Sequence, residues 1–89
     1  MEAVRLPITD SLDLHHFRPA EVADLLNDYF EACIAAGIFS VRIIHGKGTS
    51  RLKHRVQALA AGHPQVESFR SAPPEAGGWG ATLVNLRRP

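Results

Sequence analysis

The stretch 41–52, VRIIHGKGTSRL, most limits how this chain of 89 residues can fold. It begins as an apolar, β-branched run typical of a strand, turns at Gly46 and Gly48, and enters a helical pattern behind Thr49 and Ser50. A helix that starts directly after a turn leaves unpaired backbone N–H groups at its N-terminus, and the helix dipole favours an anion there. With Lys47 between the glycines, the stretch predicts a phosphate-binding turn.

The predicted anion-binding groups belong to this turn and to the first turn of the helix: Gly46, Lys47, Gly48, Thr49, Ser50 and Arg51. His45, at the start of the turn, is a candidate proton carrier. The alternative is that the glycines only make the bend and that Lys47 is solvated. The spacing is not that of a Walker A loop, which needs four residues between its first glycine and Gly-Lys-Ser/Thr, so an ATPase is not indicated.

Apolar periodicity along the chain predicts the element order β-α-β-α-β-β. The expected strands are 12–15, 38–44, 65–70 and 81–86. The first expected helix begins at Pro19 and ends at Gly37, and the second begins behind Thr49 and Ser50 and ends at Gly62. Residues 71–80 are expected to be a loop without regular structure because they are rich in proline and glycine. Right-handed crossovers place both helices on one side of the sheet and leave the other side open.

Asp13 and His15 alternate with Leu12 and Leu14, which predicts an acid and an imidazole on one face of the first strand. At the rise of a strand the two polar side chains are roughly 7 Å apart. They face the open side of the sheet if the leucines face the helices. A short strand with so polar a face is expected to meet solvent or to serve a function.

Composition limits the partners and the compartment. No apolar run approaches the ~20 residues of a membrane span, no export signal is visible at the N-terminus, and the single Cys33 excludes an internal disulfide, so a cytoplasmic protein is expected. Cys33 lies on the apolar face of the first helix and is predicted to be core. The net charge is only +1, yet five of the ten Lys and Arg lie in 42–55 with no acidic residue among them. Such a local basic patch suits a phosphate backbone.

Three segments in register resemble the Smr (small MutS-related) domain of the stand-alone bacterial type. They are LDLH at 12–15, IHGKG at 44–48 and GGWGAT at 77–82. The resemblance implies an α/β fold of the α+β two-layer type, similar to the C-terminal domain of translation initiation factor three. It implies a four-stranded mixed sheet of order 1-2-4-3 with strand 4 antiparallel. The expected domain is 11–86, between an extended arm at 1–10 and a frayed basic tail at 87–89.

The resemblance also implies a function, because Smr domains are associated with nicking of DNA and with cleavage of RNA. The matching residues are Asp13 and His15 in the first segment, His45 to Gly48 in the second, and Gly78, Gly80 and Thr82 in the third. Trp79, between the glycines of the third segment, either stacks on a base or folds back as a lid on the core. This chain departs from the pattern at His16, where many Smr domains have glycine, and that departure puts activity in doubt but not the fold.

The catalytic hypothesis uses His15 and His45 as a proton-transfer pair, with Asp13 orienting one imidazole. RNA carries its own 2′-hydroxyl nucleophile and needs no metal, whereas on DNA a divalent cation such as Mg²⁺ commonly activates water. The same three residues could form an incomplete metal triad, but no metal site is predicted, because the sequence lacks zinc-type spacing and further carboxylates. The alternatives are a DNA- or RNA-binding module without catalysis and a pure protein-interaction module. The sequence does not indicate an oligomeric state.

Overall fold

The computed structural model describes residues 9–14, 17–46, 50–76 and 78–88. The elements, in chain order, are β1 (Ser11–Asp13), α1 (Pro19–Ala35), β2 (Ser40–Ile44), α2 (Ser50–Gly62), β3 (Val66–Ser71), the short 3₁₀ helices η1 (Pro74–Ala76) and η2 (Gly78–Gly80), and β4 (Ala81–Leu86). The four strands form one sheet of order β1-β2-β4-β3, in which β1 is parallel to β2 and β4 is antiparallel to both of its neighbours. The predicted element order, sheet order and strand directions are confirmed.

Helix α1 has well-defined signals at both ends. Pro19 occupies the first turn, where a missing N–H costs nothing, and the Glu21 carboxylate accepts a hydrogen bond of 2.9 Å from the backbone N–H of Arg18. At the other end, Gly37 adopts φ +78°, and the N–H groups of Gly37 and Ile38 donate to the carbonyls of Ile34 and Cys33. This is a Schellman cap, which requires the left-handed conformation that glycine adopts without strain.

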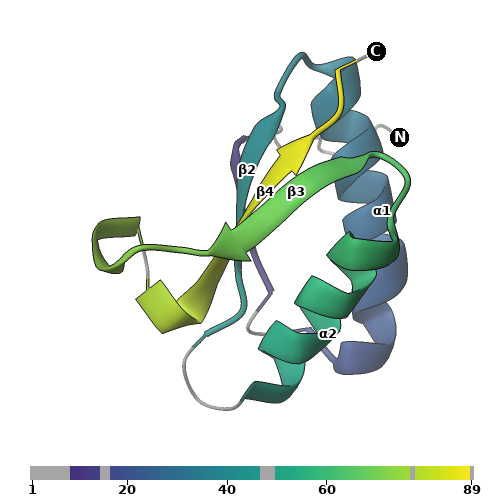
Figure 1. Cartoon of the computed structure of the whole chain (residues 1–89). Coiled ribbons are helices and arrows are strands. Elements are labelled where there is room, and N and C mark those ends of the chain that lie inside the picture. Colours follow the sequence, from purple (N-terminus) through teal and green to yellow (C-terminus); the bar gives the residue numbers. More distant parts are fainter. Residues whose placement is uncertain (1–8, 15–16, 47–49, 77, 89) are drawn as a thin grey trace, which may run out of the picture.

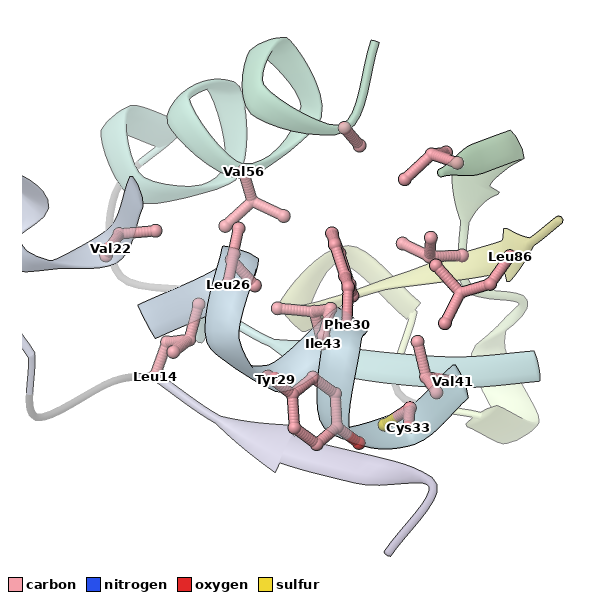
Figure 2. Close-up of a cluster of buried hydrophobic side chains, with 13 residues drawn as sticks. Leu14, Val22, Leu26, Tyr29, Phe30, Cys33, Val41, Ile43, Val56 and Leu86 are labelled. Carbon is pink, nitrogen blue, oxygen red and sulfur yellow. The ribbon is translucent and has the colours of Figure 1, made fainter. Parts of the chain in front are cut away.

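Both helices cover the same face of the sheet (Figure 1), as the crossover rule predicts. The core lies between the two layers and is built from one apolar stripe of each helix and from alternate residues of the strands (Figure 2). Its largest fully buried side chains include Phe30, Leu14, Leu26 and Ile43. Cys33 is a free, buried thiol within this core, as predicted, and burial raises the pKa of that thiol above its ordinary value.

Strand β3 departs from simple alternation. Val66 and Phe69 both face the core although they are three residues apart, because a register shift between Val66 and Ser68 inserts one extra residue into the strand. After this bulge, Ser68 and Arg70 point to the side of the sheet opposite the helices. The bulge therefore decides which β3 side chains lie on the open face.

Two expectations differ from the structure. Residues 71–80 are not devoid of regular structure, since η1 and η2 lie there; proline has a φ compatible with 3₁₀ turns, and such turns need few residues. The expected fraying of the C-terminal tail is wrong for its first two residues. Arg87 donates from its backbone N–H and its Nε to the carbonyls of Gln65 and Pro64, and Arg88 lies over the Phe39 ring at 4.7 Å.

The predicted arm at 1–10 lies outside the described residues except for its last two. Those two contact the domain, because the Tyr29 hydroxyl donates to the Thr9 carbonyl at 2.5 Å and the Arg42 N–H donates to the Asp10 carbonyl at 2.8 Å. None of the described helices is long and apolar enough to cross a membrane.

Candidate functional site

The ends of β1 and β2 lie side by side at one edge of the sheet. The two strands are parallel, so their carboxyl ends share that edge, and Asp13 is in register with Ile44. The Leu14 N–H continues the pairing with a 2.7 Å bond to the Ile44 carbonyl. The first sequence segment thus lies directly beside the start of the second.

The third segment joins the same edge through one backbone carbonyl. The N–H groups of His45 and Gly46 both donate to the carbonyl of Gly80, at 2.9 and 3.0 Å. Gly46 has φ +86°, a conformation in which any residue with a Cβ would be strained. Glycine is therefore required at the first position of the turn, and the end of η2 holds this residue in place.

The imidazole of His45 is buried, with only 4% of the residue exposed. Its Nδ1 lies 3.3 Å from the Gly46 carbonyl, and its Nε2 lies 3.0 Å from the Thr82 hydroxyl. A carbonyl oxygen can only accept, so Nδ1 carries the hydrogen. Burial lowers the pKa of His45, the positive charge of Lys53 lowers it further, and the hydrogen bond to Gly46 acts in the opposite direction.

A neutral His45 with hydrogen on Nδ1 must accept a hydrogen bond at Nε2. The Thr82 hydroxyl supplies it, and the same hydroxyl accepts a bond of 3.2 Å from the Gln57 side-chain amide. The Gln57 amide also lies 3.4 Å from the Ser71 hydroxyl. A hydrogen-bond chain therefore runs from Gln57 on α2 through Thr82 on β4 to His45 and the Gly46 carbonyl. We call these four residues the Gln57–Gly46 chain.

This arrangement holds Gly46, the first residue of the turn, more than it offers a proton to a substrate. Both ring nitrogens of His45 are occupied by partners within the protein. The imidazole bonds to Thr82, which belongs to the same face of β4 as the core residue Val84, so it lies on the helix side of the sheet. Asp13 is exposed and lies between Leu12 and Leu14, which pack against the core, so it points to the open side. The two predicted catalytic side chains share an edge but lie on different faces.

The turn leads from β2 into α2 as predicted. Ser50 and Arg51 lie in the first turn of α2, where Arg51 is exposed, and Gly78, Trp79 and Gly80 form η2. The remaining predicted site residues lie outside the described part of the chain: His15, Lys47, Gly48 and Thr49. His16, the departure from the family pattern, lies outside it as well.

Sequence reasoning missed Gln57 and Lys53, which lie one helical turn apart on α2. The only sequence signal for Gln57 is a polar residue beside the buried Val56, and nothing in the sequence links it to Thr82, 25 residues away. Within ranges 9–14, 17–46, 50–76 and 78–88, no three histidine, cysteine or carboxylate side chains come together to hold a metal ion.

Comparison with known proteins gives a consistent result. A family model of the Smr domain matches residues 12–87. The chain is 35% identical over 79 residues to a protein named Endonuclease MutS2 from Thermomicrobium roseum, covering 89% of this chain and 10% of that protein. It is 40% identical over 80 residues to Endonuclease MutS2 from Halalkalibacterium halodurans, covering 90% of this chain and 10% of that protein. The chain thus spans about a tenth of the length of these relatives.

Two solved structures share the fold. The Smr domain of Thermus thermophilus MutS2 has a TM-score of 0.84 and 35% identity, with 89% of this chain and 99% of that one covered. YdaL, a stand-alone small MutS-related protein from Escherichia coli, has a TM-score of 0.81 and 28% identity, with 92% and 67% covered. The match of the family model over nearly the whole chain, with the three segments meeting at one edge, shows that this chain belongs to the Smr domain family.

Proposed function

We propose that this Smr domain binds nucleic acid at the edge formed by the ends of β1 and β2 and the start of α2, and cleaves phosphodiester bonds there. The observation that supports the proposal is the meeting of three sequence segments at that edge through the pairing of Asp13 with Ile44 and the bonds from His45 and Gly46 to Gly80. The relatives named Endonuclease MutS2 point the same way, although the name applies to proteins about ten times longer.

Phosphate binding follows from the position of the turn. The first N–H groups of α2 have no partner within the helix, and the helix dipole adds partial positive charge at its start. Arg51 is exposed in that first turn. Lys47, which precedes the helix in the sequence, adds a second full charge, and together these groups suit a phosphodiester.

The proposed chemistry divides the three candidate residues into two roles. Asp13 and His15 act on the substrate, with the carboxylate orienting or charging the imidazole, while His45 positions the turn through its two internal hydrogen bonds. On RNA, His15 takes the proton of a 2′-hydroxyl as that oxygen forms a bond to phosphorus. The bond from phosphorus to the 5′ oxygen breaks, this oxygen takes a proton from water, and the protonated His15 returns its proton to the hydroxide that forms. The products are a 2′,3′-cyclic phosphate and a 5′-hydroxyl.

On DNA, a water molecule must replace the 2′-hydroxyl as nucleophile. A divalent cation such as Mg²⁺ would supply the activation of that water when bound. Among the described residues, Asp13 does not come together with two further histidine, cysteine or carboxylate side chains that could hold the cation with it. Cleavage is therefore compared with Mg²⁺ and with EDTA.

A second candidate function is a nucleic-acid-binding module that does not cleave. The burial of His45, with both nitrogens engaged, favours it, because one of the three candidate catalytic groups then has a purely positional role. His16, at the position where many Smr domains have glycine, also favours a module that does not cleave.

The free, buried Cys33 suits a reducing compartment, and we place either function in the cytoplasm.

The experiment that separates the two functions measures cleavage and affinity together. Purified protein is incubated with supercoiled plasmid and with structured RNA, each with Mg²⁺ and with EDTA, and binding is measured on the same substrates. A nuclease loses cleavage in His15→Ala while keeping its affinity. His54→Ala, which changes an exposed histidine on α2, is the matched control and should cleave like the wild type. Binding without cleavage in every condition would establish the binding module instead.

A further inference from the structure

The face of the sheet opposite the helices carries an ordered set of polar and cationic side chains. On β2, Val41 and Ile43 belong to the core, so Ser40, Arg42 and Ile44 point to the open face. On β4, Val84 and Leu86 belong to the core, so Leu83 and Asn85 point to the open face. With Ser68 and Arg70 of β3, these side chains form rows that cross three neighbouring strands.

One row consists of two arginines on either side of a leucine. Arg42 is in register with Leu83 on one side, and Arg70 is in register with Leu83 on the other. Strands are spaced about 4.8 Å apart, so the two arginines start roughly 10 Å from each other. Leu83 is half-buried and Arg70 is exposed. The row therefore presents an apolar surface between two cationic side chains.

The next row is a hydrogen-bonded ladder. The Ser40 hydroxyl donates to the Asn85 side-chain carbonyl at 3.2 Å, and the Asn85 amide donates to the Ser68 hydroxyl at 3.0 Å. An asparagine amide has two hydrogens and its carbonyl accepts two bonds, so Asn85 retains one donor and one acceptor position after these contacts. All three residues are exposed. The ladder fixes the orientation of an amide that can still bond to a ligand.

The two rows line a shallow hollow of about 320 Å³. Its charged residues are Arg42, Arg70 and Asp10, so cations outnumber carboxylates there. Asp13 also points to this face, beyond the row of arginines and toward the glycine turn. The hollow begins at Arg42, which lies two residues before Ile44 on β2. At the rise of a strand, Arg42 is therefore about 7 Å from the edge at which β2 ends. It thus lies close to the proposed site without sharing its residues.

We propose that this open face binds an unpaired strand of nucleic acid that leads away from the glycine turn. Arg42 and Arg70 contact successive phosphates, and a base lies over Leu83 within reach of the Asn85 amide. A duplex would present mainly its phosphates, whereas a hollow with an apolar floor and a fixed amide suits a base that is not paired. The inference rests on the proposed function and specifies its substrate as nucleic acid with a single-stranded segment.

The test measures binding of a fluorescent 12-nucleotide single strand by anisotropy at several salt concentrations. Each phosphate contact on a single strand contributes about 0.7 to the slope of log affinity against log salt. A variant that loses one contact and equals the wild type in affinity at 1 M salt should therefore bind roughly fivefold more weakly than the wild type at 0.1 M salt. Its slope should be smaller by about 0.7. We expect this for Arg70→Gln. Arg55→Gln removes the same charge from an exposed residue of α2, in the other layer, and should change the affinity by less than about twofold.

A second readout does not depend on charge. In ¹H–¹⁵N spectra, the side-chain amide of Asn85 should shift when an unlabelled single strand is added, and a duplex of equal length should shift it less. Polyglutamate tests whether the face binds any polyanion. Equal displacement of the strand by polyglutamate at matched charge would overturn the assignment in favour of an acidic protein partner.

The outcomes separate this inference from the proposed function. If the wild type binds the strand, Lys47→Ala weakens it, and Arg70→Gln matches Arg55→Gln with no shift at Asn85, the open-face inference is wrong while binding at the turn stands. If the wild type binds no nucleic acid at low salt, both are wrong. Weaker binding by Arg70→Gln together with a shift at Asn85 supports the inference, provided that the variant melts like the wild type.

Discussion

Replacement of Thr82 by valine tests the Gln57–Gly46 chain directly. Valine has nearly the shape of threonine but no hydroxyl, and Thr82 is fully buried. The change removes the donor to His45 Nε2 and the acceptor for the Gln57 amide. The cavity should stay filled, so the effect reports the hydrogen bonds and not the packing.

The magnitude follows from the burial of each partner. Leaving the buried Nε2 of His45 without a donor costs roughly 1–3 kcal/mol. Gln57 is half-buried and can turn to water or to Ser71, so it adds little. The additional apolar carbon of valine recovers at most about 0.8 kcal/mol. We expect Thr82→Val to be about 1–2 kcal/mol less stable than the wild type, which is roughly 5–15 °C in melting temperature for a domain of this size.

Urea denaturation at pH 7.5, followed by circular dichroism, gives the free energy of unfolding. Thr82→Ser is the control for the hydroxyl; it loses a methyl group and roughly 1 kcal/mol, so stability alone does not separate the two variants. The ¹⁵N shifts of the His45 ring separate Thr82→Ser from Thr82→Val. They should report hydrogen on Nδ1 in the wild type and in Thr82→Ser, and should change in Thr82→Val. A valine variant as stable as the wild type, with unchanged ring shifts, would refute the reasoning.

Three further predictions concern the buried polar groups. Burial depresses the pKa of His45 in the folded state, so the contribution of His45 to stability is complete above about pH 6.5 and is lost as pH falls through the folded pKa. In urea titrations from pH 7.5 to 5, the free energy of unfolding should therefore decline less in His45→Gln than in the wild type. The Cys33 thiol should resist a disulfide reagent at pH 8 in the native protein and react in urea. Tyr29→Phe should lower stability by about 1 kcal/mol, since it removes the bond to the Thr9 carbonyl; an unchanged urea midpoint would argue against that bond.

The elements were predictable because each has a local signal. The 3.6-residue spacing of Val22, Leu26 and Phe30, with Pro19 before it and Gly37 after it, defines α1, and all three apolar residues are fully buried or nearly so. Local signals were weaker where backbone geometry decides. The two short 3₁₀ helices at 74–80 arise in a segment whose proline and glycine content indicates only a loop.

The meeting of the three segments at one edge was predictable, but the contacts within it were not. The parallel pairing of β1 with β2 follows from a crossover through α1, so the meeting of Asp13 with Ile44 could be expected. The role of His45 could not, because its partner Thr82 is 37 residues away and Gln57 belongs to another element. The row of Arg42, Leu83 and Arg70 depends on the strand order and on the bulge in β3, neither of which has a local sequence signal.

The central claim is that the turn after β2 holds a phosphate, and the salt dependence of binding by Lys47→Ala tests it most directly. Arg88→Ala is the control, since Arg88 lies over Phe39 at the opposite end of β2. For a labelled single strand, we predict that Lys47→Ala binds roughly fivefold more weakly at 0.1 M salt, with a slope smaller by about 0.7, and that Arg88→Ala binds like the wild type. Equal affinities and equal slopes for Lys47→Ala and the wild type would contradict the account.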